Sequence, residues 1–304
     1  MSKHKNLEIR NFKWNDLEAF QRLLNAIGMH GHKNWPANVQ NLTVALNFPR
    51  VQPERNIALV HDGIDIVAYA IVEPEVNIGR SVIGFGSKST DIEILKNLVN
   101  WGTHVAAKEA PIAHVPTKDN QTQIENFLRQ IGATKVRTYL KLLSTNTPKT
   151  SALIPNGYKV RTMIGISDIP NLTEIQNAAF TGHFGYSPNT EDEVRYRILS
   201  NDFAVENISF IQNSCEQFVA YCWSDVYERK KEKIGRIEMT GVRPEFRRKG
   251  LGKTIIEVCC NQLIQKSVKS IELDVDSNNT AAIKVYKSLG FAEVSRISWW
   301  ELIL

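Results

Sequence analysis

Apolar positions in the last third of the chain follow two periods in turn. Residues 271–275 alternate apolar and acidic side chains, which is the period of a strand with one buried face. Over 255–264, apolar pairs recur every four residues, which predicts one apolar face of a helix. A second apolar helical face is predicted over 282–289, and an apolar stretch over 237–242 predicts a strand before the first helix. The pattern therefore predicts a strand–helix–strand–helix segment.

A glycine-bearing turn, Arg247-Arg248-Lys249-Gly250-Leu251-Gly252, connects the strand over 237–242 to the helix that follows. The two glycines allow a ligand to approach the backbone, and the first N–H groups of a helix have no intrahelical partners. These donors, the helix dipole and the basic side chains as far as Lys253 form an anion site. The turn therefore predicts a ligand that carries phosphate.

Spacing excludes two of the three phosphate-binding motifs that such a turn could belong to. Gly252-Lys253-Thr254 would end a P-loop, but that motif requires a glycine where Arg247 stands. A dinucleotide-binding fingerprint requires a third glycine where Ile255 stands. The pattern that remains is R/Q-x-x-G-x-G/A after a strand that ends in V-x-P.

A second block of residues connects the turn to a known family. Asn279, Ala282, Tyr286 and Gly290-Phe291 fit the pattern N-x-x-A-x-x-x-Y-x-x-x-G-F, in which Asn279 is the N-cap of a helix and Gly290 ends it. The turn and this block, in this order and spacing, resemble the GCN5-related N-acetyltransferase (GNAT) superfamily. The resemblance implies an α+β fold, with an α/β-type mixed sheet flanked by helices, and acetyl-CoA (coenzyme A) as the cofactor.

The resemblance also implies roles for individual residues. Transfer from a thioester to an amine needs a neutral amine, a stabilised oxyanion and a proton for the departing thiolate. Tyr286 occupies the position of the family's general acid, although its spacing alone would favour a core aromatic residue. Backbone N–H groups of 239–242 hold the pantetheine arm. The predicted cofactor-binding residues are Met239, Thr240, Gly241, Val242, Arg247, Arg248, Lys249, Gly250, Leu251, Gly252, Lys253, Asn279 and Ala282.

Glu238 is the predicted general base, because it is the nearest carboxylate on the cofactor strand. An ion pair on the surface with Arg236 or a lysine is an equal alternative. The predicted acceptor-binding residues are His183 and Tyr186 in a loop after the first helix of the second half, and Asp225 and Tyr227 on the adjacent strand. For His183, a surface or capping role is the alternative.

The two halves of the chain begin and end alike, which predicts a tandem duplication. Short strands over 7–10 and 158–161 are each followed by a helix, and Gly290 stands 158 positions after Gly132 before a final extended segment. We expect a degenerate GNAT-like domain over 1–146 and a catalytic GNAT domain over 157–304, joined by a polar, proline-bearing linker of about 147–156.

The first copy keeps the scaffold signals and loses the chemical ones. Its expected loop over 84–90 has glycines and hydroxyls but no R/Q-x-x-G-x-G pattern. At the same offset, Gln121 replaces Asn279 and Leu128 replaces Tyr286, and a leucine cannot donate a proton. We therefore expect catalysis in the second copy alone.

This tandem layout resembles mycothiol synthase and its bacterial relatives, in which a degenerate N-terminal acetyltransferase domain precedes an active one. Those enzymes have a histidine before the hairpin tryptophan and a glutamate at the start of the cofactor strand, where this chain has Cys222 and Arg236. The departure places the mycothiol precursor itself in question as the acceptor.

Composition narrows the remaining classes of function. The 304 residues, 42% hydrophobic and 23% charged, suit two domains of roughly 150 residues. A net charge of +5 without a basic tail does not predict nucleic-acid binding. The N-terminus lacks the apolar region of a signal peptide, and no run reaches the ~18 apolar residues of a membrane span, so we expect a cytoplasmic protein. Four cysteines without C-x-x-C spacing predict buried thiols and no metal site.

The predicted function is acetyl-CoA-dependent N-acetyl transfer, directly within a ternary complex, to a primary amine of a small molecule such as an aminosugar thiol or a related metabolite. Three alternatives stay open: a non-catalytic acyl-CoA sensor, a protein or peptide N-terminal acetyltransferase, and a nucleic-acid-binding module that uses the basic turn over 243–253. We expect a monomer or a homodimer.

Overall fold

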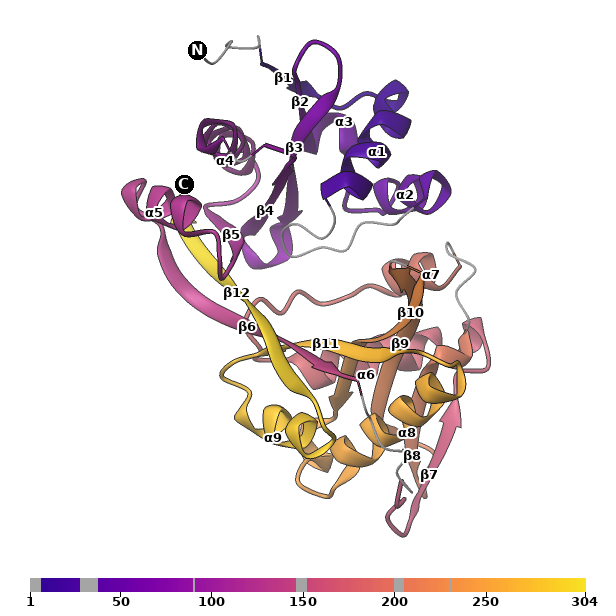
Figure 1. The fold of residues 1–304 in the computed structure, drawn as a ribbon. Coiled ribbons are helices and arrows are strands. Elements are labelled where there is room, and N and C mark those ends of the chain that lie inside the picture. The colour runs from indigo at the N-terminus through magenta and orange to yellow at the C-terminus, as the bar shows by residue number, and fades with distance from the viewer. Residues whose placement is uncertain (1–6, 28–37, 90, 146–151, 200–204, 230) are drawn as a thin grey trace. The chain divides into compact units, whose positions relative to one another are not determined.

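The computed structural model describes residues 7–27, 38–89, 91–145, 152–199, 205–229 and 231–304 (Figure 1). The chain forms two compact units. Unit 1 comprises Met1–Thr138 and Ile297–Leu304, and unit 2 comprises Tyr139–Arg296. These units differ from the expected domains 1–146 and 157–304, because the last strand of each sequence half enters the other unit. Much of the expected linker lies outside the described residues.

Unit 1 is a mixed sheet with helices packed against it, and its strand order is β1-β2-β3-β4-β5-β12. The strands are β1 (Glu8–Asn11), β2 (Ile57–His61), β3 (Ile66–Glu75), β4 (Arg80–Ser87), β5 (Ile112–Lys118) and β12 (Ala292–Ile303). The helices are α1 (Leu17–Ile27), α2 (Val39–Leu46), α3 (Pro53–Asn56), α4 (Ile92–Ala106) and α5 (Thr122–Gln130), with short 3₁₀ turns at Trp14–Asp16 and Val76–Ile78.

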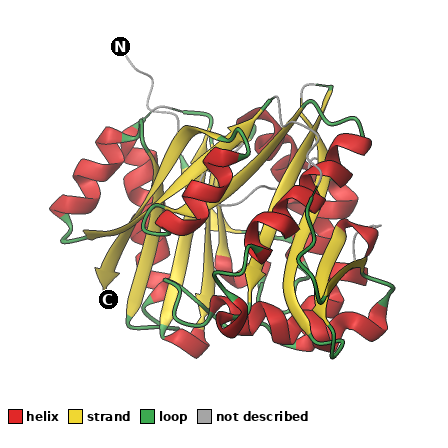
Figure 2. Ribbon diagram, turned by 90° about the horizontal axis from the view of Figure 1, so that it is seen from below, coloured by secondary structure: helices red, strands yellow, loops and turns green. Residues whose placement is uncertain are grey.

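Unit 2 repeats this arrangement with the strand order β6-β11-β10-β9-β8-β7. Its strands are β6 (Thr134–Ser144), β7 (Tyr158–Thr162), β8 (Ile208–Asn213), β9 (Phe218–Arg229), β10 (Glu232–Val242) and β11 (Ser270–Asp276). Its helices are α6 (Ile169–Phe180), α7 (Glu191–Leu199), α8 (Leu251–Gln265) and α9 (Thr280–Ser288), with 3₁₀ turns at Ile166–Asp168, Val205–Asn207 and Pro244–Phe246. Figure 2 shows helices lying against the faces of the strands.

Each sequence half gives its last strand to the other unit. Residues 139–144 of β6 pair antiparallel with β11, from Asp276↔Tyr139 to Ile271↔Ser144. Residues 297–303 of β12 pair antiparallel with β5. In Figure 1 the yellow strand β12 runs beside β5, and the magenta strand β6 runs to β11. The exchange is symmetric, so each unit is completed by a strand from the other half.

Two apolar clusters hold unit 2 together, one on each face of its sheet. One cluster lies under α8 and α9 and includes Leu140, Leu142 and Tyr286. The other lies under α6 and α7 and includes Phe210 and Tyr221. The alternation of residues along each strand explains the division, because successive side chains point to opposite faces. Two further clusters occupy the same places in unit 1.

The duplicated halves share an arginine–aspartate ion pair at the start of their first helix. Arg10 makes two hydrogen bonds of 2.7 Å to the Asp16 carboxylate, and Arg161 makes the same pair of 2.7 Å bonds to Asp168. Both arginines stand on the first strand of their half. One expectation was wrong: the segment that begins at Gly84 is still strand, since β4 continues to Ser87, and Thr90 lies outside the described residues.

Candidate active site

The glycine turn lies between the end of β10 and the start of α8, as the sequence predicts. Arg248 and Gly250 have positive φ angles of 62° and 80°, and Gly250 is the N-cap of α8. A left-handed N-cap favours glycine, since other L residues are strained there. The N–H groups of Lys253 and Thr254 already donate to the Gly250 carbonyl, at 3.0 and 3.1 Å. The N–H groups at the very start of α8 have no acceptor within the helix and suit an anion.

Three of the four basic side chains of the turn contact other groups of the protein, which the sequence does not predict. The Arg247 guanidinium donates to the carbonyls of Ala179, at 2.9 Å, and Val242, at 3.2 Å. It therefore ties the turn to the ends of α6 and β10. Lys249 Nζ lies 4.9 Å from the Phe246 ring centroid, and Lys253 Nζ lies 3.8 Å from Glu257. Arg248 is exposed. A role of these four residues in phosphate binding stays a prediction.

Strand β10 separates from β11 halfway along its length. In the described part of the chain, the parallel ladder between them pairs Ile234–Arg236 with Ser270–Glu272 and ends there. The stretch 239–242 pairs with β9 on its other side. Backbone groups of 239–242 that face β11 are therefore placed to bind a ligand. The same opening occurs in unit 1, where the β4–β5 ladder ends at Val82 and His114.

Glu238 is the extra residue of a β-bulge at the point where the strands separate. The register with β9 shifts between Ile237 and Met239. A bulge redirects a side chain and interrupts pairing. Just beyond it, the Thr240 hydroxyl donates to the Tyr221 carbonyl at 2.9 Å. A Cβ atom at Gly241 would lie 2.5 Å from the Ala179 Cβ, so only glycine fits against α6 there.

Tyr286 lies on α9, in the apolar cluster between this helix and the sheet. Its residue is 5% exposed, and its ring makes an edge contact with Phe291 at a centroid distance of 5.9 Å. Burial, and then the neighbouring thiols of Cys222, Cys259 and Cys260, raise the pKa of Tyr286. The hydroxyl is therefore protonated at neutral pH. The buried environment of these three thiols agrees with the sequence-based expectation, whereas Cys215 is exposed, so the prediction of a buried thiol is wrong there.

The N-cap predicted from the second sequence block is confirmed. Asn279 Oδ1 accepts a hydrogen bond from the Ala282 N–H at 3.1 Å. In unit 1 the residue at the corresponding place is Gln121, the N-cap of α5, and the buried Leu128 occupies the place of Tyr286. The offset between the two halves therefore identifies equivalent positions correctly. The contribution of Asn279 and Ala282 to cofactor binding stays a prediction.

Glu238 is both paired and accessible. Its carboxylate accepts a hydrogen bond from Arg236 Nε at 3.1 Å, and its side chain is 41% exposed. Desolvation by the surrounding protein raises the pKa of Glu238, whereas the positive charge of Arg236 lowers it. The nearby carboxylates of Asp225 and Asp274 raise the pKa further. The alternative prediction, an ion pair between Glu238 and Arg236, is therefore confirmed. The paired carboxylate is still accessible to water.

The predicted acceptor residues fall into two groups. Asp225 is the strand partner of Arg236 and lies beside Glu238. Tyr227, the strand partner of Ile234, lies beside Glu272 instead: its hydroxyl is buried, and burial and then the interaction with Glu272 raise its pKa. His183 lies instead beyond the C-terminal end of β10, near the glycine turn. Burial, and then the charge of Arg247, lower the pKa of His183, which favours the neutral imidazole.

Tyr186 belongs to the same group as His183. Its N–H donates to the His183 carbonyl at 3.1 Å, which shapes the loop after α6. The ring of His183 lies 5.2 Å from that of Phe180. The structure thus places His183 and Tyr186 near the glycine turn, Asp225 near the bulge and Tyr227 beside Glu272.

Sequence reasoning missed the buried carboxylate Glu272. Its side chain is 0% exposed and pairs with Lys141, Arg229 and Arg236. Its alternation with Ile271 and Leu273 indicates a solvent-facing position, and its cation Lys141 lies in the other sequence half. No local pattern links the two, because the pairing depends on the strand exchange.

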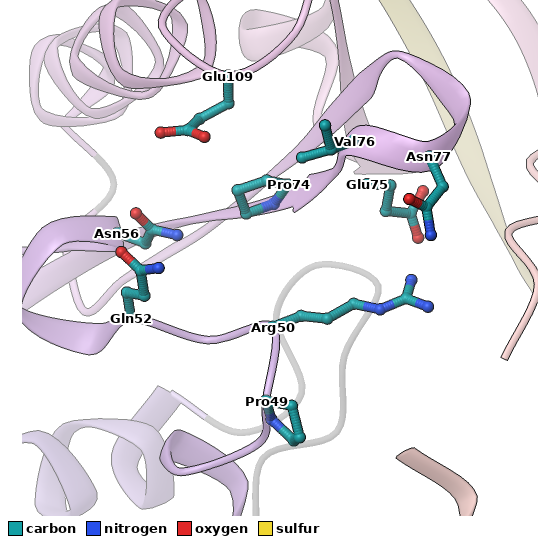
Figure 3. A pocket seen from close by; sticks show the side chains of 9 residues that line it. All are labelled: Pro49, Arg50, Gln52, Asn56, Pro74, Glu75, Val76, Asn77 and Glu109. Atoms are coloured by element: carbon teal, nitrogen blue, oxygen red, sulfur yellow. The ribbon is translucent and has the colours of Figure 1, made fainter. Parts of the chain in front are cut away.

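The described residues of unit 1 line cavities at two places. A cavity of about 450 Å³ is lined by residues that include Ser87, Ser89 and Gln121, at the place that the glycine turn has in unit 2. The other, of about 250 Å³, is shown in Figure 3. Its lining residues are Pro49, Arg50, Gln52, Asn56, Pro74, Glu75, Val76, Asn77 and Glu109, and it contains none of the predicted site residues.

Among the residues that the structure describes, no helix is long and apolar enough to cross a membrane. The same residues contain no group of three or more histidine, cysteine or acidic side chains arranged to hold a metal ion.

Comparison with known families supports what the turn, the open strand pair and the N-capped helix indicate together. Residues 169–291 match the model of the Acetyltransferase (GNAT) family. This segment is a GNAT domain. It begins at α6 and ends just after α9, so it contains the bulge, the glycine turn and Tyr286.

Curated relatives that match this segment include several mycothiol acetyltransferases. A mycothiol acetyltransferase of Tsukamurella paurometabola is 29% identical over 180 residues, 55% of this chain and 60% of the relative. One of Renibacterium salmoninarum is 26% identical over 269 residues, 83% of this chain and 74% of the relative. A third, of Nocardia farcinica, is 25% identical over 152 residues, 49% of this chain and 50% of the relative. The chain thus spans about half to three quarters of the length of these relatives.

Solved structures show that the fold is that of tandem GNAT proteins. A tandem GNAT protein from the clavulanic acid biosynthesis pathway superimposes with a TM-score of 0.75 and 14% identity, covering 98% of both chains. A GCN5-related N-acetyltransferase from Sphaerobacter thermophilus gives a TM-score of 0.72 at 20% identity, covering 97% of this chain and 95% of that one. The predicted fold, a mixed sheet flanked by helices in two tandem GNAT domains, is confirmed.

Proposed function

We propose that this protein is an acetyl-CoA-dependent N-acetyltransferase that acts on a primary amine of a small molecule. The observation that carries the proposal is the geometry of β10. This strand leaves β11 at Arg236, bulges at Glu238 and ends in a turn whose N-cap is Gly250. A base candidate, an open backbone edge and an anion site therefore follow one another along a single strand.

The residues present fit acetyl-CoA. The open edge of 239–242 suits the amide groups of a pantetheine arm, and the start of α8 suits a pyrophosphate. When bound, acetyl-CoA supplies an activated acetyl group as a thioester. The backbone N–H groups of 239–242 orient that group and stabilise negative charge on its carbonyl oxygen.

Glu238 removes the proton of the acceptor ammonium, directly or through one water molecule. Its exposure allows the acceptor to reach it, and its raised pKa makes it a stronger base than an ordinary glutamate. The neutral amine attacks the acetyl carbon, so the C–N bond forms and the C–S bond breaks. Asp225 lies beside Glu238 and binds polar groups of the acceptor, and Tyr227 stays a predicted acceptor residue.

Tyr286 donates the proton that the departing thiolate requires. Its raised pKa keeps the hydroxyl protonated, which a general acid needs at the start of the reaction. The unit 1 equivalent, Leu128, has no proton to give, so catalysis is assigned to unit 2.

The acceptor that we propose is an aminosugar thiol or a related small amine, because the curated relatives are named mycothiol acetyltransferases. Cys222 and Arg236 stand where the resemblance implied a histidine and a glutamate, so we do not propose the mycothiol precursor itself. A cytoplasmic location and a monomeric or dimeric state stay predictions.

The test is acetyl-CoA turnover by the full chain against a panel of aminosugar thiols, polyamines, amino acids and peptides. Release of free CoA is followed spectrophotometrically, and the N-acetyl product is identified by mass spectrometry. We expect turnover with a small amine and none with peptide N-termini. Binding of acetyl-CoA without acetylation of any amine in the panel would favour the acyl-CoA sensor instead.

A further inference from the structure

The charged centre beside the candidate base is built around Glu272, a carboxylate with no solvent exposure. Lys141 Nζ lies 2.9 Å from its Oε2, and Arg236 Nη1 lies 3.1 Å from its Oε1. A buried carboxylate that loses a paired cation is strongly destabilised. Although burial raises the pKa of Glu272, Lys141 and Arg236 lower it overall, so the carboxylate stays ionised.

Lys141 reaches this centre only because of the strand exchange. It belongs to β6, the last strand of the first sequence half, and it is the strand partner of Asp274 on β11. Its neighbours Leu140 and Leu142 point into the apolar cluster around Tyr286, so Lys141 points to the opposite face. Only 13% of the Lys141 side chain is exposed, so solvent screens the Lys141–Glu272 pair weakly.

Arg236 connects Glu272 to Glu238. Its Nε donates to Glu238, its Nη1 to Glu272 and its Nη2 to Asp274, at 3.1, 3.1 and 2.7 Å. A guanidinium is a rigid planar fork, so a change at one of its partners reorients the others. Although burial lowers the pKa of Arg236, the carboxylates of Glu238 and Asp274 raise it, and its charge is permanent.

We propose that Lys141 is a positioning residue for the acetyl-transfer site: by holding Glu272, it orients Arg236 and, through Arg236, the base Glu238. The first sequence half therefore takes part in the chemistry of the second, although it lacks the acid and the glycine turn. This inference rests on the proposed function of Glu238 as the base.

The direction of the effect follows from charge. Without Lys141, the charge of Glu272 is less compensated, so Arg236 is drawn toward Glu272 and away from Glu238. Both changes favour protonated Glu238. The groups that face these two carboxylates are Asp225, Tyr227 and Arg229 from β9, Arg236 from β10, Asp274 from β11 and Lys141 from β6.

The test compares Lys141→Met with Lys141→Arg, and with Lys159→Met as a control for net charge. Lys159 forms an exposed pair with Glu216 at 2.9 Å, in the same unit, so its loss changes the net charge by the same amount and breaks only this exposed pair. Two quantities are measured in the full chain: the pH dependence of kcat/KM, and the titration of the Glu238 carboxyl carbon by NMR, identified by its loss in Glu238→Gln.

In Lys141→Met we expect the acid limb of kcat/KM, and the NMR midpoint of Glu238, to move up by about half a pH unit or more. Lys141→Arg and Lys159→Met should keep the wild-type midpoint, and acetyl-CoA affinity should be unchanged in all three. A Lys141→Met protein whose midpoint equals that of wild type overturns the inference.

A second comparison applies even if Lys141→Met does not fold. Lys141 acts through the charge of Glu272, so adding Lys141→Met to Glu272→Gln should leave the Glu238 midpoint of the single variant unchanged. A further shift in the double variant contradicts the inference. The NMR titration of Glu238 does not require the protein to be catalytically active. An inactive wild-type protein with the expected shift rejects the proposed function alone, while an active protein without the shift rejects only the role of Lys141.

Discussion

Arg236 and Glu238 are two residues apart on β10, and their side chains form a hydrogen bond of 3.1 Å across the β-bulge. In a regular strand, residues at this spacing point to the same face, and the bulge brings this pair to the place where β10 and β11 separate. The base candidate is thus held by the arginine next to it and remains 41% exposed.

Glu238→Gln removes the base with little change in volume. We expect kcat to fall by roughly 10²–10⁴, the usual contribution of general base catalysis. In the wild-type enzyme, activity should be lost as pH falls through the raised pKa of Glu238, because the protonated carboxyl cannot accept a proton. Glu232→Gln, at an exposed position on the same strand, is the matched control and should keep wild-type kcat. A pH–rate profile of Glu238→Gln with an unaltered acid limb would contradict the assignment.

Tyr286→Phe removes one hydroxyl from a buried ring whose edge contact with Phe291 is retained. If the hydroxyl protonates the thiolate, kcat should fall by roughly 10²–10⁴ while acetyl-CoA affinity and the unfolding midpoint barely change. Single-turnover kinetics measure the chemical step directly. Tyr158→Phe, at the edge strand β7, should behave as wild type. Near-native single-turnover rates in Tyr286→Phe would exclude Tyr286 as the acid.

Gly250→Asp places a negative charge at the N-cap of α8, where the phosphates are expected. Acetyl-CoA affinity should fall at least tenfold, about 1.4 kcal/mol, by calorimetry. The control is Gly157→Asp, because Gly157 has nearly the same φ, 83° against 80°, and a Cβ atom meets nothing within 4 Å at either glycine. Both variants place an L residue at a similar left-handed φ angle, so loss of affinity in both would indicate backbone strain and not the phosphate site.

The sequence predicts the parts of the site that depend on local order. The turn around Gly250, the N-cap Asn279 and the helix that carries Tyr286 are each encoded within a few residues, and the structure contains all three. Lys141 and Glu272 could not be paired from the sequence. Both final strands alternate apolar residues, and this alternation fits either unit equally well. Tertiary pairing determines which unit each final strand joins, and the local apolar period does not predict that pairing.

The bulge escaped prediction for a similar reason. An extra residue at Glu238 changes which side chains of β10 face each layer, and neither of its neighbours, Ile237 and Met239, is a glycine or a proline that would mark the interruption. Regular alternation places Glu238 on one face with Arg236 and Thr240. In the structure Glu238 and Arg236 form a pair, while the Thr240 hydroxyl bonds to the Tyr221 carbonyl.

The strand exchange predicts that the second sequence half does not fold alone. A fragment of residues 157–304 lacks β6, and with it Leu140 and Leu142 of the apolar cluster around Tyr286, as well as the cation of buried Glu272. Loss of one buried leucine costs about 2–5 kcal/mol, and whole domains are stable by about 5–15 kcal/mol. We therefore expect no cooperative urea transition for 157–304.

A fragment of residues 134–296 restores β6 and should unfold cooperatively, because it contains the whole of unit 2. Circular dichroism and urea titration of the two fragments make the comparison, and the full chain supplies the reference. The fragments also separate two views of the duplication. If the halves were independent domains, 157–304 would be the more stable fragment, since it keeps its own last strand β12. Cooperative unfolding of 157–304 with the stability of 134–296 would mean that β12 replaces β6 beside β11, and that the exchange is not required for unit 2 to fold.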